Sequence, residues 1–133
     1  MDLKVRKLQK AVHGIKQLND KINTVKDKDD LLIDGLKNGL SQKFEYSTEL
    51  LWKAIKKYLF VYDGIEAKSP KKSIKEFYLA GHINEENYML LIKALDVRNY
   101  LSHIYNDYEF QRIYNNIPKY IHTFLLDIDR IKT

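Results

Sequence analysis

The chain of 133 residues has no cysteine, only two prolines and five glycines, and no long hydrophobic run. The absence of cysteine excludes disulfides, thiolate metal sites and a cysteine nucleophile, and is typical of proteins in a reducing compartment. No apolar segment approaches the roughly 18 residues needed to span a bilayer, and residues 1–10 lack the continuous apolar core of a signal peptide. We therefore expect a single cytoplasmic domain over residues 1–133 that does not enter a membrane.

Apolar residues recur at spacings of three and four along nearly the whole chain, which is typical of amphipathic helices. This spacing predicts one helix over about residues 3–26 and another over about residues 31–62, whose apolar stripe runs from Leu36 to Val61. A last helix follows Asn106 and Asp107, and Pro118 is expected to kink it or split it near Asn116.

Two capping signals divide the middle of the chain. Ser69 followed by Pro70 predicts the start of a short helix, which Gly81 should end. Asn84 then predicts the start of the next helix. With no strand pattern and short links, the sequence predicts an all-α fold, an antiparallel four- to five-helix bundle.

The net charge is +5, with 23 Lys and Arg against 18 Asp and Glu, and this modest excess favours an anionic partner. The lysine groups at 53–57 and 68–75 are interpreted as solvated helix faces because no aromatic-interleaved RNA motif accompanies them. His13 and His122 have no paired ligands at metal spacing, and no glycine-rich loop is present to hold phosphates. The sequence predicts no metal and no cofactor.

The least expected stretch is residues 98–105, Arg-Asn-Tyr-Leu-Ser-His-Ile-Tyr. It continues the apolar face of the fourth predicted helix with polar groups that core packing does not require. Arginine binds phosphate through a planar fork of donors, and histidine can exchange protons near neutral pH. A looser Arg6 and His13 pair shows that the spacing alone is a weak signal, and it is the neighbouring Asn, Ser and Tyr that favour phosphodiester chemistry here.

Helical geometry separates the two main groups of this motif. Arg98 and His103 are five residues apart, about 140° around a regular helix, so they do not converge on one phosphate. Either the helix distorts or two chains combine, and a two-fold dimer that brings both copies of the motif to one cleft is the interpretation we favour. The residues also allow structural roles: Arg98 as the ion-pair partner of Glu45 or Glu49, and His103 bonded to a neighbouring backbone.

Three segments, in order, resemble those of the HEPN superfamily, and within it the nucleotidyltransferase substrate-binding proteins encoded beside a minimal nucleotidyltransferase (MNT) as a toxin and antitoxin pair. They are residues 42–53 (Gln-Lys-Phe-Glu-Tyr-Ser-Thr-Glu-Leu-Leu-Trp-Lys), residues 73–83 (Ser-Ile-Lys-Glu-Phe-Tyr-Leu-Ala-Gly-His-Ile) and residues 98–105. The first is the most specific, because helicity does not demand a Phe-Glu-Tyr followed by Glu-Leu-Leu-Trp-Lys.

The resemblance implies a helical bundle that forms a homodimer, with Arg98 and His103 as the R-x4-H active site of a metal-independent ribonuclease. It also implies that Tyr105 is the tyrosine that the partner nucleotidyltransferase modifies with AMP (AMPylation), while Asn99 fits the polar position after the arginine. The implied protein is the toxin component of a HEPN/MNT toxin-antitoxin pair, an endoribonuclease neutralised by its MNT antitoxin.

In that interpretation the RNA 2′-OH is the nucleophile, His103 acts as general base or acid, Arg98 stabilises charge on the phosphate and Asn99 orients the phosphate or the imidazole. Ser102, Glu45 and Glu49 are expected to support the site. The alternative is a noncatalytic substrate-binding subunit of a minimal nucleotidyltransferase. A helical interaction module with neither role is the third possibility.

Overall fold

The structure, a computed structural model, describes residues 3–24, 30–101 and 107–132. Across these residues the chain forms helices and no strand, which confirms the predicted all-α fold. The elements are α1 (Leu3–Thr24), α2 (Asp30–Tyr58), a π-helical turn η1 (Leu59–Asp63), α3 (Pro70–Leu79), α4 (Glu85–Leu101) and α5 (Asp107–Ile131). None of the described helices is both long and apolar enough to cross a membrane.

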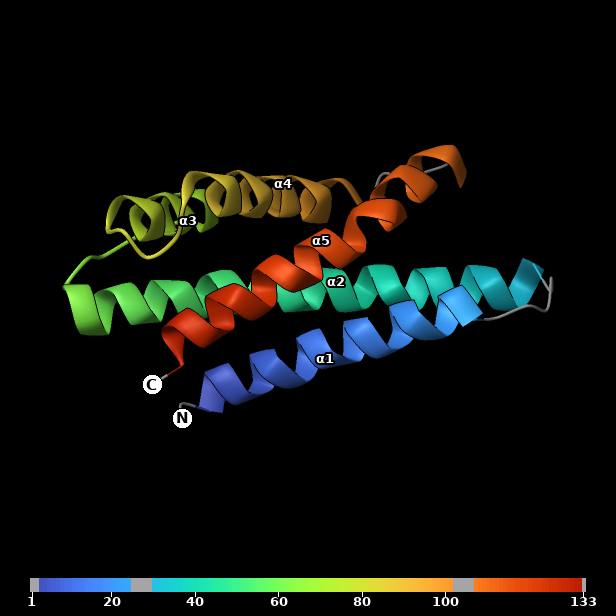
Figure 1. The fold of residues 1–133 in the computed structure, drawn as a ribbon, viewed down its shortest axis with the longest axis horizontal. Helices are drawn as coiled ribbons and strands as arrows, with labels where there is room; N and C mark the ends of the chain where they lie inside the picture. The colour runs from blue at the N-terminus through green and yellow to red at the C-terminus, as the bar shows by residue number, and fades with distance from the viewer. Residues whose placement is uncertain (1–2, 25–29, 102–106, 133) are drawn as a thin grey trace.

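Helix α2 is the central element of the bundle (Figure 1). It runs along the length of the molecule and contacts α1, α3, α4 and α5. Helix α1 lies antiparallel to α2 on one side, whereas α3 and α4 lie on the other side, and α5 crosses between these layers and contacts both α1 and α4. Different faces of α2 therefore contact different helices. The face on which a polar residue of α2 lies determines which neighbouring helix its side chain can reach.

The core contains buried hydrophobic side chains from all five α-helices. Phe44 of α2 is fully buried at its centre, and its ring centroid lies 5.6 Å from that of Tyr120 and 5.8 Å from that of Phe124, both on α5. The predicted stripe of α1 is buried or partly buried over its described length, from Val5 to Ile22. Helical periodicity thus identified the faces that pack.

The predicted caps are present. The hydroxyl of Ser69 accepts a hydrogen bond from the Lys72 N–H at 3.4 Å, and Pro70 occupies the first helical position of α3. Asn84 accepts a hydrogen bond from the Asn87 N–H at 2.8 Å and begins α4. Because these side chains satisfy backbone donors that have no partner within the helix, they fix where each helix starts.

The second helical stretch ends close to the predicted residue 62, but its last turn is π-helical and not α-helical. The α-helix ends at Tyr58, and Leu59–Asp63 forms the π-helical turn η1, after which Gly64 adopts the left-handed conformation with φ 67°. The wider turn rotates the apolar stripe away from the core, so Val61 is 58% exposed instead of buried. A left-handed residue carries a steric penalty unless it is glycine, so Gly64 suits this end of the helix.

Of the kink and the split expected at Pro118, the split is wrong, because α5 continues through Pro118. An internal proline costs about 3 kcal/mol through a lost hydrogen bond and a steric clash. The exposed Pro118 is flanked by Ile117, Tyr120, Ile121 and Phe124, which are all buried. Burying each such side chain contributes roughly 1.5–3 kcal/mol, so packing of this face outweighs the proline.

Candidate functional site

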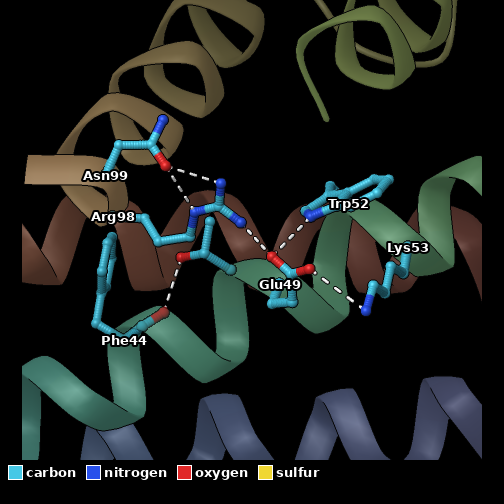
Figure 2. A network of polar contacts seen from close by, with 7 residues as sticks. Phe44, Glu49, Trp52, Lys53, Arg98 and Asn99 are labelled. Carbon is cyan, nitrogen blue, oxygen red and sulfur yellow. Dashed lines mark hydrogen bonds and ion pairs between the residues drawn. The ribbon is translucent and has the colours of Figure 1, made fainter. Parts of the chain in front are cut away.

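Only part of the predicted site can be placed. Ser102, His103 and Tyr105 lie outside the described residues, whereas Arg98 and Asn99 lie in the last turn of α4 and Glu45 and Glu49 lie on α2. The structure brings Arg98, Asn99 and Glu49 together and adds two neighbours of Glu49 on α2 (Figure 2).

Arg98 and Glu49 join α4 to α2 by an ion pair. The Nη1 of Arg98 donates to the Oε2 of Glu49, and the two residues are 49 positions apart in the chain. The Arg98 side chain is 21% exposed and that of Glu49 is 36% exposed, so the pair is partly shielded from water at the boundary between the helices. This contact is the ion pair that the sequence offered as a structural role for Arg98.

Asn99 holds the other edge of the same guanidinium. Its Oδ1 accepts hydrogen bonds from Nη2 of Arg98 at 2.8 Å and from Nε at 3.2 Å. A guanidinium has five N–H donors, of which the described contacts with Glu49 and Asn99 use three. The arginine is thus held on two sides, and two N–H groups have no partner among the described residues.

Glu49 is itself positioned by its own helix. The indole N–H of Trp52 donates to Glu49 Oε2 at 3.0 Å, and the Lys53 Nζ lies 3.3 Å from Oε1. Residues three and four apart share a helix face, which explains this geometry. Glu49 therefore connects an aromatic side chain and two cations, and its orientation is fixed before any ligand arrives.

The charges around Glu49 decide its protonation. Partial burial raises the pKa of this carboxyl, but the hydrogen bonds from Trp52 and Lys53 and the positive charges of Arg98 and Lys53 lower it by more. The net pKa lies below the ordinary value of 4.5. Glu49 is ionised at neutral pH, so it serves as a fixed anionic support for Arg98 and not as a proton donor.

Glu45 has a different position. It lies one turn before Glu49 on α2 and is half-buried, and no hydrogen bond or ion pair joins it to Arg98 among the described residues. Of the two candidate partners for Arg98, the structure selects Glu49.

A hollow of about 450 Å³ on another side of α4 carries two cations that the sequence did not single out. It lies between α4 and α5 and is lined in part by Lys93, Tyr100 and Arg112. Tyr100 and Arg98 are two residues apart, about 200° around the helix, so this hollow does not share a face with the Arg98 and Glu49 pair. No sequence signal beyond isolated charge identifies Arg112, because its relation to Lys93 depends on how α4 packs against α5.

Metal chemistry has no support in the described part of the chain. No group of three His, Cys, Asp or Glu side chains there is arranged to hold a metal ion. The chemical capacity of the described site is to hold a positive charge at a defined place, beside the segment that contains His103.

Replacing Glu49 by Gln is expected to uncouple Arg98 from α2. Because both side chains remain partly solvated, the coupling free energy in a double-mutant cycle with Arg98→Gln should be about 1 kcal/mol, measured by urea unfolding. Glu45→Gln is the matched control on the same helix and should show no coupling to Arg98. A coupling of zero for Glu49 would contradict a role for it in holding the arginine.

Comparisons with known proteins give one family match and a similar solved structure. Over residues 3–132 the chain matches the family described as nucleotidyltransferase substrate binding protein like. No curated protein matches it. A crystal structure of a protein from Thermus thermophilus is similar, with 26% sequence identity and a TM-score of 0.81 over 95% of this chain and 99% of that one. The family match covers nearly the whole chain, and the protein therefore belongs to the nucleotidyltransferase substrate binding protein like family.

Proposed function

We propose that the protein is the noncatalytic helical subunit of a minimal nucleotidyltransferase and that it binds the substrate on which that enzyme acts. The observation that carries this proposal is the family match over residues 3–132. The described geometry is compatible with it, because Glu49, Trp52 and Asn99 fix the position of Arg98 at the boundary of α2 and α4 without forming a proton-transfer site. A fixed guanidinium with unused donors suits recognition of a phosphate or carboxylate.

Association with a nucleotidyltransferase is the direct test of this proposal. If the adjacent reading frame encodes a minimal nucleotidyltransferase, co-expression with it is expected to give a complex that survives size-exclusion chromatography, with its mass measured by light scattering. The same enzyme expressed alone serves as the control for its elution position. Separate elution of the two chains at micromolar concentration would rule out a stable subunit.

A second function is favoured by the motif R-x4-H-x-Y formed by Arg98, His103 and Tyr105. It is a metal-independent endoribonuclease, the toxin half of a pair that its nucleotidyltransferase partner neutralises. In this function the RNA 2′-OH attacks the adjacent phosphate to form a 2′,3′-cyclic phosphate, and the bond from phosphorus to the leaving 5′-oxygen breaks. His103 takes the proton from the 2′-OH or gives one to the 5′-oxygen, and Arg98 stabilises the charge on the phosphate. AMP on Tyr105 blocks the site. The way Glu49 and Asn99 hold Arg98 would support catalysis equally well.

For the ribonuclease function we favour a homodimer over a local distortion of the helix. The 140° offset between Arg98 and His103 on a regular helix keeps them from one phosphate, so two copies of the motif in a shared cleft would supply the missing group. RNA cleavage in the presence of a chelator separates the two functions, since a substrate-binding subunit leaves RNA intact.

A further inference from the structure

The groove between α1 and α2 gathers positive charge. Its volume is about 650 Å³, and three lysines line it, Lys7 and Lys10 from α1 and Lys43 from α2. His13 lines it as well, and no acidic side chain is among the described residues that do. This groove is on the α1 side of α2, whereas Glu49 and Arg98 meet on the α4 side (Figure 2).

No carboxylate in the described part of the chain neutralises these three lysines. None of them takes part in an ion pair with a described residue. Lys43 leans across the helix boundary, because a Cβ placed on Gly14 of α1 would lie 3.8 Å from its Nζ. Like charges gathered in one groove repel each other, and an anion bound between them relieves this repulsion.

A buried hydroxyl gives a second, independent indication of a ligand. Ser47 borders the groove one turn after Lys43, its side chain is fully buried, and its Oγ has no hydrogen-bond partner among the described residues. Buried polar groups in proteins are nearly always hydrogen-bonded, so the Ser47 hydroxyl is a group that a water or a ligand atom in the groove would satisfy.

Tyr46 completes the chemistry of the groove. Its side chain lines the groove and is 56% exposed, which leaves its ring face accessible to a planar ligand. Lysines that contact phosphates beside an exposed aromatic ring that stacks on a base are the combination used to bind nucleotides without sequence preference. The lining extends along α1 from Lys7 to Gln17, about 15 Å at 1.5 Å per residue, which exceeds the size of a single phosphate.

We propose that the α1–α2 groove is a nucleotide-binding site, in which Lys7, Lys10 and Lys43 contact phosphates and Tyr46 stacks on a base. The ligand chemistry is that of a nucleoside phosphate, supplied either by a free nucleoside triphosphate or by a single-stranded polynucleotide. The site is separate from the Arg98 region, and it does not rest on either proposed function.

The test uses the protein alone, in the presence of EDTA, with two probes. ATP is titrated by calorimetry, and a short single-stranded 2′-O-methyl oligonucleotide is followed by fluorescence anisotropy. The methylated probe has no 2′-OH nucleophile, so it stays intact even if the protein cleaves RNA. Binding of ATP alone identifies a free nucleotide as the ligand, and binding of the oligonucleotide identifies a strand.

The variant Lys7→Gln/Lys43→Gln is expected to weaken binding by at least about tenfold. For the oligonucleotide, the slope of log K against log salt should fall in magnitude by about 1.4, since each single-strand phosphate contact contributes about 0.7. Lys75→Gln is the matched control, because Lys75 is exposed on α3 and outside the groove. Binding of neither probe, or an equal loss with Lys75→Gln, would overturn the proposal.

Two further variants distinguish specific nucleotide binding from general electrostatic attraction to the basic surface. Tyr46→Ala should weaken binding by about fivefold or more through lost stacking, and Ser47→Ala by about tenfold through a lost hydrogen bond to a charged ligand. Neither substitution changes the net charge, so general attraction to the basic surface does not depend on them. Unchanged affinity in both variants would show that the groove has no specific site, and would also overturn the proposal.

Discussion

We expect the protein to lose stability between about pH 4 and pH 8, and replacing Asp127 by Asn is expected to remove most of that loss. Asp127 lies on α5 and is fully buried. Neither of its carboxylate oxygens makes a well-formed hydrogen bond to a described residue, although the side-chain amide of Asn87 is close enough to act on its charge. Burial raises its pKa to about 8 from the ordinary value of 3.8, and the neighbouring Asn87 amide offsets only part of this. The folded protein therefore holds a proton that the unfolded chain releases.

The direction of the pH effect follows from this difference in proton binding. Between the pKa of the unfolded chain, near 3.8, and the folded value of about 8, the native state binds more protons, so stability falls as pH rises through that window. At about 1.36 kcal/mol per pKa unit the total loss above pH 8 has an upper limit on the order of 5 kcal/mol. Below pH 4 both states are protonated and the effect disappears.

Urea unfolding at several pH values measures the effect. Asp127→Asn keeps the shape of the side chain, has no charge to release and can donate to the unpartnered Oδ1 of Asn87. Asp129→Asn is the matched control, because Asp129 lies two residues later on the same helix and is exposed. If the difference in unfolding free energy between the natural protein and Asp127→Asn stays constant from pH 4 to pH 9, Asp127 is not protonated in the fold.

Local signals in the sequence were sufficient for much of the fold. Ser69, Pro70 and Asn84 act on backbone groups within one turn, so their effect does not depend on the rest of the chain. The apolar spacing of α1 likewise identified a face that packs, because any partner helix requires it. The helix caps and the apolar face of α1 depend only on residues within a few positions, so the local sequence is enough to predict them.

Features that depend on distant segments could not be predicted. His82 follows α3 in a turn. Its Nε2 lies 2.7 Å from Asp63 Oδ2, and its Nδ1 accepts a hydrogen bond from Arg130 Nε at 3.2 Å. Since arginine is only a donor, Nδ1 is unprotonated and the proton is on Nε2, toward Asp63. These two contacts of His82 connect η1 to α5, and no local sequence pattern predicts them.

The candidate site likewise has features that the local sequence predicts and features that depend on how the helices pack. Arg98 stood out because a charged residue interrupts an apolar face, and both Glu45 and Glu49 were possible partners. Helical spacing alone could not choose between them, because residues one turn apart share a face of α2. The packing of α4 on α2 made the choice for Glu49. The α1–α2 groove was missed since Lys7, Lys10 and Lys43 meet only through the packing of α1 on α2.

Loss of the His103 imidazole is expected to lower RNA cleavage by roughly 10² to 10⁴, if the protein is the endoribonuclease that its motif predicts. The assay is cleavage of labelled RNA in EDTA by the purified protein and by His103→Ala, with folding checked by circular dichroism. His122→Ala is the matched control, because His122 is exposed on α5 and outside the motif. Cleavage that persists at the original rate in His103→Ala would come from a contaminating nuclease.

Variants of the arginine cluster show whether Arg98 acts in the same reaction. Arg98→Ala removes the phosphate contact and should abolish cleavage, whereas Glu49→Gln keeps the guanidinium but loosens its position and should lower the rate only in part. Mixing the inactive His103→Ala and Arg98→Ala proteins should restore a fraction of activity, because a mixed dimer contains one intact copy of each group. If the unaltered protein leaves RNA intact over a wide range of sequences, Arg98 holds a ligand without cleaving it, and the substrate-binding subunit is the function that stands.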